Sequence, residues 1–208
     1  MNSLVHIAPT EWLTVFPEQS RRNIPRDVDV YSYEYSPESV FLVEQGAAAE
    51  IRYHEDGTSH VVGFTGRNEI LIAGRPEPTR STTIRATAVT DCIVRMLSKG
   101  DFTLRTLAKP ELASLYMRQL AKKLEVAREL STISSLPASA DHVLAILKAV
   151  ARNCGFGVSE EGKSPLSIRP SLLERMTGTP PHILSVAMHQ LLLRGEITFQ
   201  QDSVQWPT

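Results

Sequence analysis

The segment from Leu172 to Ile197, LLERMTGTPPHILSVAMHQLLLRGEI, restricts the fold more than any other part of the chain. Arg169-Pro170 is expected to open a short helix whose inward residues are Leu172, Leu173 and Met176. Gly178 can supply the positive φ that a tight turn between two helices needs. Thr179 is predicted to cap a second helix, and Pro180 and Pro181 suit its first turn. The pattern therefore predicts a helix-turn-helix.

The second of these helices has one predicted apolar face, because its apolar residues recur at the spacing i, i+3, i+4, i+7 and i+8 from Leu184. The face comprises Leu184, Ala187, Met188, Leu191 and Leu192. With that face turned inward, the outward face carries His182, Ser185, Val186, His189 and Leu193. After Gly195 the runs EITF and SVQW are expected to pair around residues 200–202. They would form a small wing beside the two helices.

Residues 26–98 have the pattern of short strands separated by Gly, Pro and Asp clusters, which is typical of an antiparallel roll or barrel. Asp56-Gly57 lies between two β-rich runs and predicts a hairpin turn. Cys92 falls within the apolar run DCIVRML and is interpreted as a core residue, since buried free cysteine behaves as a small hydrophobe.

Helical patterns begin at Ser98, with a short helix in KGDFTLRTLAK and a long one from Pro110 to about Ser134. Along the long helix, apolar residues follow the 4-3-4-3 spacing of a coiled-coil seam: Ala113, Met117, Leu120, Leu124 and Ala127. We expect this seam to pair with a second copy of the chain. The alternative is a single helix packed only against its own domain. Pro137 should end the helix, and Ser139 should cap the next one, which extends to Gly155.

Composition limits the classes of function. The 208 residues carry a formal net charge of −1, with a pI of about 6.6, so any binding to nucleic acid must depend on local charge. No apolar run approaches a membrane helix, and no signal peptide is evident. Two distant cysteines cannot hold a four-cysteine iron–sulfur cluster, and we expect free thiols in a cytoplasmic protein. We find no motif of an enzyme active site, so no catalytic residue is predicted.

Together, a roll, a long helix, a hinge, a helix-turn-helix and a wing resemble the cyclic-AMP receptor protein/FNR family of bacterial transcriptional regulators. The resemblance covers the chain from about residue 20 onward. Its most specific stretches are TRSTTIRATAVTDCIVRMLSKGDF, KKLEVAREL and the helix-turn-helix segment. It implies an α+β fold made of a cyclic-nucleotide-binding-like β-roll (1–108), a dimerisation helix and hinge (109–136) and a winged-helix DNA-binding domain (137–208). Double-stranded DNA and a second copy of the chain would be the partners, with RNA polymerase and a small anionic effector as further candidates.

The resemblance is incomplete where family members bind cyclic AMP. Arg80-Ser81 matches the Arg-Ser pair that holds the cyclic phosphate, but Ile70-Leu71 occupies the position of the family's Gly-Glu pair, and Ala127-Arg128 that of its purine-binding Thr-Ser pair. We therefore expect no cyclic AMP in the familiar pose. Arg80, Ser81 and Arg128 remain candidates for an anionic effector, and the alternative is that Arg80 and Ser81 only close a turn.

The resemblance is also incomplete on the DNA-reading helix. The family's early Arg-Glu pair and its second arginine fall on Pro181, His182 and Val186, which removes the strongest contacts to guanine. His182 and Ser185 remain as hydrogen-bonding candidates, and Val186 could meet a thymine methyl group. Arg169, Arg175 and His189 could meet phosphates, which position a protein without reading sequence. The candidate DNA-binding residues are Arg169, Ser171, Thr179, Pro181, His182, Ser185, Val186 and His189.

Two functions remain open at this point. One is a homodimeric DNA-binding regulator with altered specificity, and the other is a signalling or protein-interaction protein that kept the fold and lost DNA binding. A metal or heme sensor is a weaker alternative, because the six histidines are scattered along the chain. His54 and His60 flank one hairpin and could meet across it, but we predict no metal site.

Overall fold

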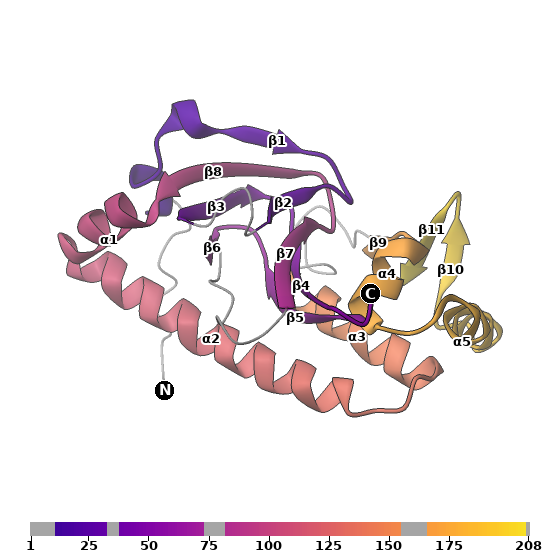
Figure 1. Ribbon diagram of the computed structural model, residues 1–208. Helices are drawn as coiled ribbons and strands as arrows, with labels where there is room; N and C mark the ends of the chain where they lie inside the picture. Colours follow the sequence, from indigo (N-terminus) through magenta and orange to yellow (C-terminus); the bar gives the residue numbers. More distant parts are fainter. Residues whose placement is uncertain (1–10, 33–37, 73–81, 155–165, 207–208) are drawn as a thin grey trace, which may run out of the picture.

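The computed structural model describes residues 11–32, 38–72, 82–154 and 166–206. Within these residues the N-terminal half contains two four-stranded antiparallel sheets, with strand orders β1-β8-β3-β6 and β2-β7-β4-β5. The sheets face each other as the predicted roll (Figure 1). The strands and two preceding 3₁₀ turns are η1 (Trp12–Thr14), η2 (Glu18–Ser20), β1 (Arg22–Ile24), β2 (Asp29–Ser32), β3 (Ser39–Gln45), β4 (Ala48–His54), β5 (Ser59–Thr65), β6 (Glu69–Ile72), β7 (Thr82–Ala88) and β8 (Cys92–Ser98).

The interior of the roll is filled by side chains that alternate along the strands. Tyr31 and Phe41 stack with ring centroids 5.9 Å apart, and Leu71 belongs to the same apolar cluster. Cys92 is buried there, as predicted, and burial raises the pKa of its thiol. A second cluster forms where Trp12 and Phe16 pack against Phe102, which lies in the helix that follows β8. The roll is therefore held by two adjoining apolar cores.

The hairpin between β4 and β5 confirms the turn predicted at Asp56-Gly57. Gly57 has a φ of +81°, and the Asp56 carboxylate accepts hydrogen bonds from the backbone and the hydroxyl of Thr58. A side chain that bonds to the backbone two residues later is a common way to stabilise a tight turn. The hairpin includes β5, the edge strand of its sheet, which packs against helices of the C-terminal half.

The helices follow as predicted, with α1 at Lys99–Leu107, α2 at Pro110–Ser134 and α3 at Ala140–Cys154. Figure 1 shows α2 running along the sheets, with α3 returning beside its C-terminal end. Two lysines attach α2 to the roll: Lys122 Nζ lies 2.5 Å from Glu69 Oε1, and Lys123 Nζ lies 2.7 Å from Glu50 Oε1. The hydroxyl of Ser139 accepts from the backbone of His142, which confirms the expected cap.

The C-terminal part contains β9 (Leu166–Ile168), α4 (Pro170–Thr177), α5 (Pro181–Leu193), β10 (Thr198–Gln200) and β11 (Ser203–Trp206). The expected wing is present, but β9 adds a third strand that was not predicted, paired with β11. One apolar cluster joins this part to the roll, since it includes Ile51 and Val61 of the hairpin together with Val143 and Leu172. The packing therefore sets how the helix-turn-helix lies on the roll.

Candidate nucleic-acid interface and cavities

The turn between α4 and α5 depends on Gly178. Its φ is +65°, as predicted, and its N–H donates to the carbonyl of Glu174 at 2.9 Å, which closes the end of α4. The predicted cap by Thr179 is wrong, because Pro180 is the residue that precedes α5 and no side chain caps that helix. With two consecutive prolines at its start, α5 has its N-cap position at Pro180, one residue after Thr179. Thr179 is instead 1% exposed, and its hydroxyl has no hydrogen-bond partner among the described residues.

Helix α5 presents the face that the sequence predicts. Leu184, Ala187 and Leu191 are buried, whereas Val186 is 58% exposed and Leu193 75% exposed. The inward assignment of Leu192 is wrong, since its exposed fraction is 40%. The helix ends at Leu193, so Leu192 lies at its margin, where little of the body remains to cover it.

Almost all of the candidate DNA-binding residues are exposed on the helix-turn-helix. Those that are exposed there are Arg169, Ser171, Pro181, His182, Ser185, Val186 and His189. Thr179 is a correction: its side chain is buried in the turn, so this surface does not offer it to a ligand. The exposed residues come from the start of α4 and the outward side of α5, and both helices lie beside the wing (Figure 1).

The arginines around this surface already have partners within the protein. Arg169 Nη1 lies 3.1 Å from Asp27 Oδ2 in the roll, and Arg194 Nη1 lies 2.8 Å from Asp141 Oδ1 on α3. Arg175 donates from Nη1 to the hydroxyl of Tyr53 at 3.3 Å. Their side chains are partly exposed, so they can still reach solvent, but they contribute less free positive charge than their number suggests.

Helix α4 contacts the β4–β5 hairpin directly. The hydroxyl of Ser59 donates to the backbone carbonyl of Arg175 at 2.9 Å. A Cβ atom added at Gly178 would lie 2.5 Å from the carbonyl oxygen of Ser59, which is closer than real Cβ atoms approach. Gly178 is therefore needed for two reasons, its positive φ and this close approach. The hairpin thus fixes the position of the helix-turn-helix on the roll.

The predicted seam on α2 is uncovered within the chain. Met117 is 70% exposed, Leu120 45% and Leu124 53%, and Ala127 is also exposed, while Ala113 is half-buried. The opposite side of α2 is buried against the roll and α3 through Leu112, Val126, Leu130 and Ile133. The helix therefore packs on its own domain with one side and leaves an apolar stripe on the other.

The position of the family's Gly-Glu pair belongs to the core in this protein. Ile70 is 1% exposed and Leu71 0%, and the side-chain amide of Gln119 bonds to the backbone of Ile70. Arg80 and Ser81, the predicted effector residues, lie outside the described residues. Arg128 is exposed on α2 and lines neither of the two cavities described next, whereas the adjacent Ala127 lines both.

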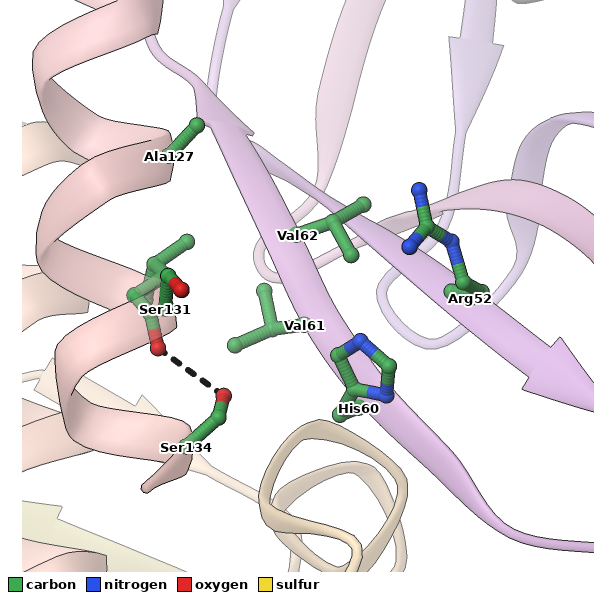
Figure 2. A pocket seen from close by; sticks show the side chains of 8 residues that line it. Arg52, His60, Val61, Val62, Ala127, Ser131 and Ser134 are labelled. Carbon is green, nitrogen blue, oxygen red and sulfur yellow. Dashed lines mark hydrogen bonds between the residues drawn. The ribbon is translucent and has the colours of Figure 1, made fainter. Parts of the chain in front are cut away.

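Two half-open cavities lie between the hairpin and α2. The larger, of about 390 Å³, is lined by Arg52, His60, Val61, Val62, Ala127, Leu130, Ser131 and Ser134. Figure 2 shows Arg52 and His60 on the strand side and the two serines on the helix side. The smaller, of about 270 Å³, lies farther toward the start of α2 and includes Glu50 and Lys123, which bond to each other. Sequence reasoning missed the larger cavity, because its residues come from separate elements.

His54 and His60 meet across the hairpin, as the sequence suggested. Nε2 of His54 lies 3.2 Å from Nδ1 of His60, and the two rings stack. Burial lowers the pKa of His60, and the neighbouring His54 and Arg52 lower it further. Within the described residues no group of three or more His, Cys, Asp or Glu residues is placed to hold a metal ion. Among the same residues, every helix is too short or too polar to cross a membrane.

Comparisons with known proteins give a likeness in structure alone. No protein-family model matches the sequence, and no curated protein matches it. The c-di-GMP responsive global regulator CLP from Xanthomonas campestris is 18% identical, with a TM-score of 0.67 over 95% of this chain and 96% of that chain. FixK2 from Bradyrhizobium japonicum is 17% identical, with a TM-score of 0.67 over 90% and 92%. TTHB099, a CRP-family transcriptional regulator from Thermus thermophilus, is 13% identical, with a TM-score of 0.69 over 90% and 92%. The protein therefore has the fold of the CRP/FNR transcriptional regulators.

Proposed function

We propose that the protein is a homodimeric, DNA-binding transcriptional regulator that acts in the cytoplasm and carries out no catalytic step. The observation that carries the proposal is the outward side of α5. His182, Ser185, Val186 and His189 are exposed there while the opposite side of the same helix is buried. An exposed helix of a helix-turn-helix is the element that enters the major groove in proteins of this architecture.

The exposed stripe on α2 supports the dimer. Paired apolar residues at seam spacing bury one another when two helices come together, and Ala127 allows close approach. In proteins of this architecture the twofold axis places two reading helices about 34–36 Å apart, on one face of the DNA. We propose that residues 109–136 form the dimerisation segment between an effector-binding-like roll and the DNA-binding domain.

Selection from a pool of random duplexes tests this function. We expect the full-length protein to enrich a sequence with twofold symmetry. Its affinity should fall as salt rises, because neutralised phosphates release counterions. The decrease should be shallow for a regulator, since Arg169 and Arg194 are already paired with Asp27 and Asp141.

A protein-interaction role is the second candidate, and the apolar residues of the outward side favour it. Val186 and Leu193 are largely exposed beside few free cations. Absence of binding to any duplex at low salt, with the dimer intact, would support this role and contradict the first.

A further inference from the structure

We propose, on the basis of the DNA-binding function proposed above, that Val186 reads the 5-methyl group of a pyrimidine in the major groove. The preferred half-site then contains a thymine against Val186, and 5-methylcytosine replaces that thymine better than cytosine does. The methyl groups of thymine and 5-methylcytosine occupy the same place on the base edge that faces the major groove. Binding therefore depends on one methyl group in each half-site.

The composition of α5 limits which bases the helix can select. Its sequence, PHILSVAMHQLLL, contains no Lys, Arg, Asp or Glu, and the structure describes every residue of the helix. Arginine and lysine make the commonest specific contact to guanine, and aspartate and glutamate accept from the amino group of cytosine. Because α5 lacks these side chains, it has no charged group with which to select a G·C pair. Thymine instead offers a methyl group that an apolar side chain can contact.

Val186 lies where such a contact can form. It is 58% exposed on the outward side of α5, in the second turn of the helix that begins at Pro181. The N-terminal part of a recognition helix is the part that approaches the base edges. His182, one turn earlier, and Ser185, the preceding residue, are both exposed. Their polar groups can bond to neighbouring bases while Val186 contacts the methyl group.

The packing of α5 holds Val186 in one position. Leu184 and Ala187 are each 2% exposed and Leu191 is 0% exposed, so the inward side of the helix is anchored to the body of the protein. A β-branched side chain in a helix occupies essentially one rotamer. Contact with a methyl group therefore costs Val186 little conformational freedom, and most of the free energy of the contact is kept.

The charges beside this surface increase the share of affinity that comes from base contacts. Arg169 is paired with Asp27 and Arg194 with Asp141, which reduces the sequence-independent attraction to phosphates. Burial of one methyl group changes an affinity about fourfold. A dimer on a site with twofold symmetry makes the contact twice, so a change in both half-sites should alter the affinity about fifteenfold.

The test measures the affinity of the full-length protein for the motif that it selects from random duplexes. At each thymine of the half-site, deoxyuridine replaces thymidine, which removes only the methyl group. At the position that responds, cytosine is compared with 5-methylcytosine, because these two bases also differ only by the methyl group. In both comparisons we expect the methylated duplex to bind about fourfold more tightly for each half-site, as measured by fluorescence anisotropy.

Variants of Val186 assign the effect to this side chain. Val186→Ala should respond to neither methyl group. It should melt no lower than the unchanged protein, because the position is exposed and Ala has the higher helix propensity. Val186→Arg should enrich a G·C pair at the same position of the motif. Val28→Ala is the matched control, the same change at an exposed valine of the roll, and it should keep the full methyl effect.

The outcomes separate this assignment from the proposed function. Equal binding of thymine and deoxyuridine at every position of a bound duplex would overturn the role of Val186 and leave DNA binding itself intact. A methyl effect that persists in Val186→Ala would do the same, as would a selected half-site without thymine. Absence of binding to any duplex would overturn both the role of Val186 and the proposed function.

Discussion

The side-chain amide of Gln119 satisfies both backbone polar groups of Ile70. The N–H of Ile70 donates to Oε1 of Gln119 at 3.0 Å, and Nε2 of Gln119 donates to the carbonyl of Ile70 at 2.6 Å. Both residues are buried, and together they attach the middle of α2 to strand β6. The contact lies at the position that the sequence resemblance assigns to the Gly-Glu pair of the cyclic-AMP-binding proteins, and here a side chain of the protein bonds to that stretch of backbone.

Removing this amide should destabilise the fold. Gln119→Met keeps the approximate size of the side chain but leaves the N–H and the carbonyl of Ile70 unpaired in a buried place. We expect a loss of about 2–4 kcal/mol in the free energy of unfolding, measured by urea denaturation. Gln190→Met, the same change at an exposed position of α5, should alter it by less than about 0.5 kcal/mol. Equal effects of the two changes would show that the amide contact contributes nothing.

The contact between Gly178 and Ser59 can be separated from the positive φ of the glycine. Gly195 has a φ of +70° and open space around it, whereas a Cβ atom at Gly178 would meet the carbonyl oxygen of Ser59. Gly195→Ala should cost about 1 kcal/mol for the backbone conformation alone. Gly178→Ala should cost about 1–3 kcal/mol more, because helix α4 must move away from the hairpin. Chemical denaturation of both variants measures the difference, and similar losses would contradict the close approach.

The seam on α2 predicts the oligomeric state. Leu120→Asp places a charge in the centre of the exposed apolar stripe, where pairing with a second copy would bury it without a partner. Light scattering should show a dimer for the unchanged protein and a monomer for this variant. Leu193→Asp, at a more exposed leucine on α5, should remain dimeric. A dimer in the Leu120→Asp sample would place the interface elsewhere.

The outward side of α5 predicts which changes alter sequence preference. Replacing His182 and Ser185 by Ala removes the polar groups that could read base edges, so the motif selected from random duplexes should change. Arg169→Ala should weaken binding with little change of the motif, because a phosphate contact carries no sequence information. That variant also loses the ion pair with Asp27, so its melting temperature must be measured alongside. An unchanged motif in the double variant would remove these two residues from the reading surface.

Stability should fall in mild acid through His142. Its ring is 6% exposed, Nδ1 has no partner among the described residues, and burial lowers its pKa. The unfolded chain binds a proton at the His142 ring more readily than the folded protein does. The free energy of unfolding therefore keeps its full value above about pH 6.5. It decreases as the pH falls from there toward the lowered pKa of the folded state, by up to about 1.4 kcal/mol per pH unit.

Urea denaturation at a series of pH values measures this dependence. His142→Leu should flatten the decrease between about pH 7 and 5, leaving the part due to His60, whose pKa is also lowered. Lys148→Leu, at an exposed position of the same helix, should keep the original decrease. An unchanged slope in His142→Leu would show that this ring does not govern the acid response.

Local patterns were enough to predict the elements that carry the proposed function. The bounds of α2 and the turn at Gly178 follow from helix periodicity, proline placement and the glycine requirement for positive φ, all of which act within a few residues. The cap by Thr179 failed because Pro180 shifted the start of α5 by one position. Strand β9 was missed because a three-residue strand has too little pattern to recognise, and it exists only because β11 lies beside it.

By itself, the sequence determined the order of the elements, the buried and exposed sides of α5, and the exposed apolar stripe of α2, because these depend on side-chain periodicity along one segment. Only the tertiary structure decided that Gln119 bonds to Ile70, that Ser59 meets Gly178, and that Arg52 and His60 face Ser131 across a cavity. Those partners are separated by many residues along the chain. Their meeting depends on how sheets and helices pack against one another, which no local pattern specifies.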